Sequence, residues 1–301
     1  MKPERVRLPR TIEWLARLPL CGEPELAELL GVDAIDARHL VHELVGRGWV
    51  ESIEPGSPEL ELRRLACIRD EALPALAAAL DLAPADVLRA VPVQLKDTLD
   101  RVARAEITSG MNRLFAGIAA AVRRSGTAEL VDARSLPLTV PVGERWWLPV
   151  TEGYGCLRSG NLWAPFLVAW DRARAPDLYR RRRVAAWSTG RAGVVPRWGA
   201  DGLPPILVVC PSHRELRVWE QALLRRSDDG SAVQLDALLT TREQLLEHGP
   251  GGAVWQVPAE DHAVPLVERL GWGAAPPVAP VCLPDEIDGL AERRRIAGLQ
   301  R

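Results

Sequence analysis

The strongest constraint on the fold is a pair of short amphipathic segments near the N-terminus, separated from a third by a glycine turn. Residues 11–18 and 23–30 carry apolar side chains at intervals of three and four, the spacing of one helical face. Gly31 then turns the chain, and Asp33 is placed to cap a third helix that runs to about residue 45. This pattern predicts a helix-turn-helix.

Two strand-like segments follow the third helix. They cover residues 49–54 and 59–67, and the turn sequence Pro-Gly-Ser-Pro at 55–58 joins them. A hairpin at this place predicts a winged helix-turn-helix over residues 1–83, in which residues 68–82 form a helix that packs back on the motif.

The hydrophobic periodicity changes beyond a predicted linker at residues 84–100. A helical pattern over 95–124 precedes short apolar runs that alternate with two further helices. We expect helices at 176–187 and 213–226, and strands at 129–133, 146–150, 154–159, 166–171, 206–210 and 234–240. The order helix, three strands, helix, strand is that of the restriction-endonuclease-like, or PD-(D/E)XK, fold, and it predicts such a domain over residues 101–270. Residues 271–301 are predicted to form a Pro/Gly-rich C-terminal tail with a late helix. The fold class predicted for the whole chain is α/β (α+β).

Charge is distributed unevenly along the 301 residues, whose formal net charge is −2. Residues 1–66 hold nine Lys/Arg and twelve Asp/Glu, whereas residues 172–197 hold eight arginines and one acid. The small net charge argues against a protein that coats nucleic acid without specificity. The uneven distribution predicts that the basic surface lies outside the helix-turn-helix.

Cysteine and hydropathy patterns exclude several protein classes. The five cysteines lie far apart without a CxxC pair, which argues against a disulfide framework or a zinc cluster. No apolar run approaches the length of a membrane helix, so we expect a cytoplasmic protein with no membrane contact.

The third helix has a polar face formed by Ile35, Arg38, His39 and His42. In a helix-turn-helix such a face enters the major groove, so these residues are predicted to contact double-stranded DNA. The hairpin carries several glutamates, which phosphates repel, and a role for the motif in docking a protein stays open.

Three stretches of the chain resemble the replication-relaxation proteins of bacterial plasmids and integrative elements. They are TEGYGCLRSG at 151–160, AWDRAR at 169–174 and RVAAW at 183–187, which match a PDGY-type strand, an ExDRGT strand end and a Kxxx[YF] helix. The resemblance spans nearly the whole chain. It implies a DNA-binding accessory or regulatory protein of a mobile genetic element, acting in plasmid replication, mobilisation or transcription control.

Departures from that family pattern fall on its acidic positions. The first acid matches Glu152, the second Ala169, the third Asp171, and the lysine Arg183. Alanine cannot bind a metal, and an arginine with a pKa above about 12 is a poor proton acceptor. The resemblance therefore implies a degenerate nuclease domain without a cofactor. The alternative is a Mg²⁺-dependent endonuclease or nickase that holds one metal on Glu152 and Asp171, with Arg183 beside them.

Arginines beside these positions are predicted to grip DNA phosphates by bidentate hydrogen bonds and to supply most of the electrostatic affinity. They are Arg172, Arg174, Arg180, Arg181, Arg182 and Arg183. Ser212 lacks the flanking glycines of a nucleophile elbow and is predicted to cap the helix that follows it. Possible partners besides DNA are a second copy of the chain and a replication or conjugation protein.

Overall fold

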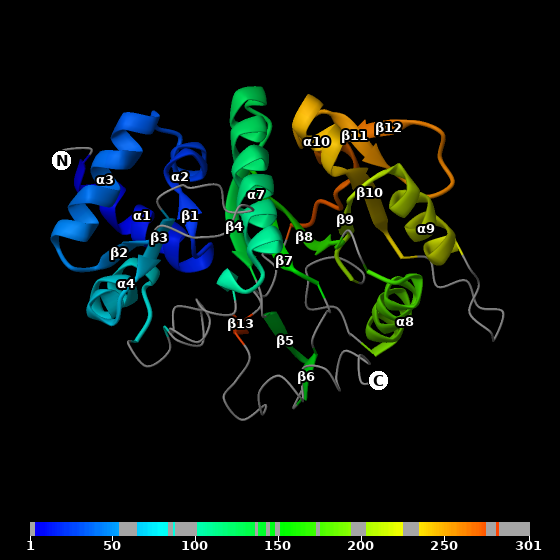
Figure 1. The fold of residues 1–301 in the computed structure, drawn as a ribbon, viewed down its shortest axis with the longest axis horizontal. Helices are drawn as coiled ribbons and strands as arrows, with labels where there is room; N and C mark the ends of the chain where they lie inside the picture. The colour runs from blue at the N-terminus through cyan, green and yellow to red at the C-terminus, as the bar shows by residue number, and fades with distance from the viewer. Residues whose placement is uncertain are drawn as a thin grey trace. The chain divides into compact units, whose positions relative to one another are not determined.

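A computed structural model of the chain describes residues 4–53, 65–83, 87, 101–135, 138–142, 145–147, 151–172, 175–193, 203–224, 235–274 and 281–282. It is a mixed α/β structure, as the sequence predicts (Figure 1). The chain forms two compact units, the first comprising residues 1–120 and 133–137 and the second residues 121–132 and 138–301. No helix in the described ranges is long and apolar enough to cross a membrane.

Unit 1 combines helices with a small antiparallel sheet in the order β1-β3-β2. Its N-terminal elements are α1 (Glu4–Arg17), β1 (Cys21–Gly22), α2 (Glu23–Leu30), α3 (Ala34–Gly46), β2 (Val50–Ile53), β3 (Leu65–Ile68), a short 3₁₀ helix (Asp70–Ala72) and α4 (Leu73–Leu80). The predicted turn at 55–58 lies outside the described residues.

Local sequence explains the turn between α2 and α3. Gly31 ends α2 with a left-handed backbone (φ 67°), which glycine adopts without a steric cost. The Asp33 side chain then accepts a hydrogen bond from the amide of Asp36 at 2.7 Å and caps α3. The inner face of α3 is buried through Ala37, Leu40, Val41 and Leu44. Both predicted helix ends are confirmed.

Unit 1 extends beyond the predicted boundary at residue 83, because it includes much of α7 (Ala105–Ser125). Asn112 Nδ2 donates a hydrogen bond to the carbonyl of Pro19 at 3.1 Å, and Ala105 packs in an apolar cluster with Leu20. Of the predicted linker 84–100, only Val87 is described, and its side chain is buried.

Unit 2 is built on a seven-stranded mixed sheet in the order β12-β11-β10-β9-β8-β7-β4 (Figure 1). The strands of this sheet are β4 (Glu129–Ser135), whose last three residues belong to unit 1, β7 (Gly153–Ser159), β8 (Leu162–Trp170), β9 (Ile206–Cys210), β10 (Ala237–Thr241), β11 (Ala253–Gln256) and β12 (Ala263–Pro265). β7 and β8 are antiparallel, β8, β9 and β10 run parallel, and β11 and β12 return antiparallel. The carboxyl ends of the three parallel strands therefore meet at one edge.

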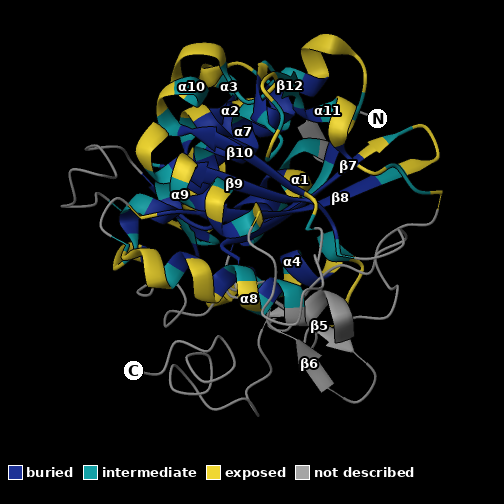
Figure 2. Cartoon of the chain, turned by 90° about the vertical axis from the view of Figure 1, so that its right-hand side faces the viewer, coloured by how far each residue is buried: buried dark blue, intermediate teal, exposed yellow. Residues whose placement is uncertain are grey.

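Two helices connect the parallel strands and cover one face of the sheet. They are α8 (Asp177–Gly193) and α9 (His213–Leu224), and the rings of Trp187 and Trp219 stack between them with centroids 5.4 Å apart. Both tryptophans belong to a buried cluster with apolar side chains of β7 to β10, which are dark blue in Figure 2. The predicted helices at 176–187 and 213–226 are thus confirmed in type.

The strands differ from the expectation in two respects. The strand predicted at 146–150 is present as β6 (Arg145–Trp147), and it lies in a separate small sheet with β5 (Leu138–Val142) and β13 (Val281–Cys282). The main sheet continues past β10, with α10 (Arg242–His248) and α11 (Leu266–Arg269) beside its last strands. β11 and β12 have only four and three residues, which is too short for a periodic signal. The predicted late helix of the tail lies outside the described residues.

Candidate functional site

The three predicted acid and base positions lie in one buried polar cluster. Glu152 directly precedes β7, Asp171 directly follows β8, and Arg183 lies on α8. Glu152 is 7% exposed, and Asp171 and Arg183 are fully buried. Antiparallel pairing sets the start of β7 beside the end of β8, which explains why residues far apart in sequence meet here.

Arg183 neutralises Glu152. Its Nη2 donates to Glu152 Oε2 at 2.6 Å, and the same oxygen accepts the Trp170 amide at 2.8 Å. The guanidinium carbon lies 5.4 Å from the ring of Trp187 and 5.8 Å from that of Trp219, so the charge is held among aromatic faces. Burial alone would lower the pKa of Arg183, but Glu152, Tyr179 and Asp171 together more than offset this and the pKa is raised. The side chain is a permanent cation and cannot act as a proton acceptor.

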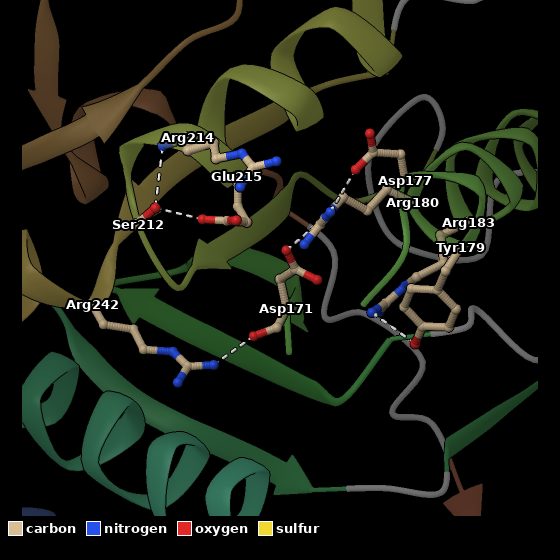
Figure 3. Close-up of polar contacts among 9 residues, drawn as sticks. All are labelled: Asp171, Asp177, Tyr179, Arg180, Arg183, Ser212, Arg214, Glu215 and Arg242. Atoms are coloured by element: carbon tan, nitrogen blue, oxygen red, sulfur yellow. Dashed lines mark hydrogen bonds and ion pairs between the residues drawn. The ribbon is translucent and has the colours of Figure 1, made fainter. Parts of the chain in front are cut away.

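Arg180 neutralises Asp171 in the same way (Figure 3). Arg180 Nε donates to Asp171 Oδ2 at 2.8 Å, and Arg180 Nη1 donates to Asp177 Oδ1 at 3.0 Å. Arg242, the first residue of α10, donates from Nη2 to the backbone oxygen of Asp171 at 2.6 Å. Asp171 Oδ1 is buried without a hydrogen-bond partner among the described residues.

The residues present do not fit a magnesium site. Each carboxylate is already paired with a buried arginine, and Ala169 lies in the apolar cluster with Tyr154 and Trp187. Within the described part of the chain, no three His, Cys, Asp or Glu side chains are arranged to hold a metal ion. A hard divalent cation needs several oxygen ligands free to coordinate it, and this cluster does not offer them.

The predicted arginine surface is only partly exposed. Arg180 and Arg183 are buried in the ion pairs described above, so neither is part of the exposed basic surface. With 3.6 residues per helical turn, positions 180 and 183 share the inner face of α8, while Arg181 and Arg182 face outward. α8 accordingly shows alternating buried and exposed stretches in Figure 2.

Three of the predicted phosphate contacts remain available. Arg172, Arg181 and Arg182 are exposed, and their guanidinium groups make no hydrogen bond or ion pair with any described residue. Arg174 lies outside the described residues. The outer side of α8 and the segment before it therefore carry uncompensated positive charge.

The outer face of α3 is charge-compensated. Ile35 is 66% exposed, and Arg38, His39 and His42 are exposed as well. Arg38 Nε lies 3.0 Å from Glu23 Oε2 of α2, whereas the two imidazoles make no contact with a charged group of the described chain. Two further ion pairs compensate this region: Arg7–Asp36 at 2.7 Å and Arg47–Glu43 at 2.5 Å.

Sequence reasoning missed the residues that follow the other two parallel strands. Arg242 follows β10, and Arg214 and Glu215 lie in the first turn of α9 after β9. Ser212 caps α9 as predicted, since its Oγ accepts the Arg214 amide at 3.2 Å. The Ser212 hydroxyl also donates to Glu215, which lowers the pKa of that carboxyl. Consecutive parallel strands were the available signal, because their carboxyl ends gather at one edge.

Comparisons with protein-family models, with curated proteins and with solved structures found no match to this chain.

Proposed function

We propose that the protein binds double-stranded DNA and does not cut it. Unit 1 acts as a winged helix-turn-helix that reads the duplex through α3, and unit 2 acts as a restriction-endonuclease-like domain that holds the DNA backbone. The resemblance to replication-relaxation proteins supports a role in plasmid replication, mobilisation or transcription control. A second copy of the chain or a replication or conjugation protein is the expected partner.

The order of elements in unit 1 supports the DNA-reading role. Helix α1, strand β1, helices α2 and α3, and then the paired strands β2 and β3 follow the connectivity of a winged helix. The second helix of such a motif presents its outer face to the major groove. On α3 that face carries Ile35, His39 and His42, none of which is engaged in an ion pair.

The proposal that the protein does not cut DNA is supported by one observation: both acidic positions are paired with buried arginines. The order α7, β4, β7, β8, α8, β9, with β5 and β6 of the small sheet between β4 and β7, supports a nuclease-like fold. Nucleases of this type hold Mg²⁺ on two or three carboxylates. Here Arg183 is paired with Glu152, Arg180 is paired with Asp171, and Ala169 supplies no ligand.

Two measurements on the full chain test this function. We expect fluorescence anisotropy to detect binding to duplex DNA that is equal in EDTA and in Mg²⁺, and we expect supercoiled plasmid to stay uncut with Mg²⁺ or Mn²⁺. Metal-dependent nicking that disappears in an Asp171→Ala protein would instead establish the nuclease alternative. Absence of duplex binding at low salt would reject the proposal.

A protein-docking role for unit 1 is the second candidate, and the compensated charges around α3 favour it. Arg38 and its neighbours pair with carboxylates and leave little positive charge for phosphates. Ile35→Asp separates the two roles, because a new carboxylate in the major groove is repelled by DNA. If DNA affinity is unchanged by Ile35→Asp while binding of a partner protein is lost, unit 1 docks protein.

A further inference from the structure

The edge at which β8, β9 and β10 end carries charged side chains from three segments. Asp171 follows β8, the first turn of α9 follows β9, and Arg242 follows β10. Ligands of open α/β sheets bind outside the carboxyl ends of parallel strands, because chain segments diverge there and expose polar groups. None of these residues has a role in reading DNA through α3.

Helix α9 presents its N-terminus at this edge. The helix has twelve residues, and its partial positive charge lies at the first turn. Arg214 belongs to that turn, is exposed, and its guanidinium makes no hydrogen bond or ion pair with a described residue. In Figure 3 its side chain runs past Glu215 and points to the side on which Arg180 lies. Because the Arg214 amide donates to Ser212, the helix would contribute its partial positive charge to an anion, and the Arg214 guanidinium would contribute the hydrogen bonds.

Arg180 supplies an independent sign of a ligand. Its side chain is 3% exposed, Nε and Nη1 are used by Asp171 and Asp177, and Nη2 is buried without a hydrogen-bond partner. An unpaired buried donor on a charged group is costly unless something occupies it. Figure 3 shows the Arg180 side chain beside Glu215 in the first turn of α9. The Ser212 hydrogen bond is the main cause of the lowered pKa of Glu215, and the charge of Arg180 adds to it.

We infer that Arg180, Arg214 and the first turn of α9 form a binding site for a phosphate group. Two neighbouring carboxylates are offset by arginines: Asp171 is paired with Arg180, and the charges of Arg180 and Arg214 both act on Glu215. A phosphodiester of bound DNA or a free phosphate can supply the group. The DNA source rests on the proposed function, whereas the free phosphate source does not.

Inorganic phosphate titrated into the full chain and followed by calorimetry and ³¹P NMR tests the site directly. Arg214→Ala is expected to weaken phosphate binding about tenfold, because it removes a charge-assisted hydrogen bond. Arg217→Ala is the matched control: Arg217 lies on the same helix, but it is paired with Glu220 at 2.8 Å and is expected to leave phosphate binding unchanged. Arg180→Lys keeps a charge beside Asp171 but removes Nη2, and it should weaken phosphate binding as well.

A second arm measures duplex DNA affinity of the same variants across salt concentrations. If the phosphate comes from DNA, Arg214→Ala reduces the slope of log K against log salt by about 0.9, and Arg217→Ala does not. Phosphate binding that depends on Arg214, without any DNA binding, supports the site with a free phosphate and rejects the proposed function. DNA binding in which Arg214→Ala and Arg217→Ala behave alike, in both arms, overturns the site and leaves the proposed function standing. Binding of neither probe overturns both.

Discussion

Glu152 and Arg183 form a buried ion pair that is part of the folded core. Both groups are removed from water, and each is tolerated because the other lies 2.6 Å away. Removing one partner leaves an uncompensated buried charge, which is far more costly than losing the pair. The two positions are therefore expected to be strongly coupled in stability.

We predict that Arg183→Met lowers the free energy of unfolding by about 3–5 kcal/mol, and that the double variant with Glu152→Gln recovers part of that loss. Urea unfolding of the four proteins measures the coupling. Arg158→Ala is the control, because Arg158 pairs with Glu129 at 3.1 Å on the surface and should cost at most about 1 kcal/mol. Additive effects of the two buried substitutions would contradict the coupling.

A buried thiol gives the second prediction at this scale. Burial, and then the charge of Asp132, raise the pKa of Cys156 to about 11. The thiol ionises in the unfolded chain near its ordinary pKa of 9.0, but in the folded chain only near 11. The unfolded state thus releases its proton first, and the contribution of Cys156 to stability is full below pH 9 and is lost as pH rises toward 11.

Cys156→Ala is accordingly expected to flatten the fall in unfolding free energy between pH 9 and 11 by up to about 1.4 kcal/mol per pH unit. Urea unfolding at pH 8, 9.5 and 10.5 measures this slope. Cys67→Ala provides the comparison, since Cys67 is only partly buried. Equal slopes for the two variants and the parent chain would show that Cys156 does not stay protonated in the fold.

The pairing of β7 with β8 depends on a glycine at a position of close approach. Gly155 lies opposite Phe166 in the ladder, and a Cβ at 155 would overlap the ring of Phe166. Phe166 is fully buried, so its ring has no free space into which it can move. Gly155→Ala is therefore predicted to lower the unfolding free energy by about 1–3 kcal/mol, measured by thermal or urea unfolding.

Gly46 provides the matched comparison for this element. It lies in the last turn of α3, and a Cβ there meets no atom within 4 Å. Gly46→Ala is expected to be neutral or to stabilise by up to about 1 kcal/mol, because alanine is the better helix former. A loss of stability equal to that of Gly155→Ala would indicate a general cost of removing glycine instead of a clash with Phe166.

Elements with a strong local signal could be predicted from sequence, and those defined by distant partners could not. Gly31 and Asp33 fix the ends of α2 and α3 through backbone conformation and capping, which are local effects. The inner position of Arg180 and Arg183 on α8 also follows from helical periodicity. Their carboxylate partners do not, because the pairing of Arg183 with Glu152 spans 31 residues and exists only once the sheet has formed.

At the scale of the whole molecule, charge is divided between the two units. Around α3, arginines pair with carboxylates, as Arg38 does with Glu23, so this face has little uncompensated positive charge to attract phosphates. On α8, Arg181 and Arg182 are exposed without a partner among the described residues. If the protein binds DNA as proposed, sequence preference and electrostatic affinity should be separable by substitution.

We expect Arg181→Ala with Arg182→Ala to weaken binding to every duplex and to reduce the slope of log K against log salt by about 1.8, because two phosphate contacts are lost. His39→Ala should instead leave the slope unchanged and alter which sequences are selected from a random duplex library, since the proposed function places this imidazole against base edges. Anisotropy at several salt concentrations and sequencing of the selected pools measure the two effects. If the arginine variant changes the selected sequences, or if His39→Ala reduces the salt slope, then sequence preference and electrostatic affinity are not separated between α3 and α8.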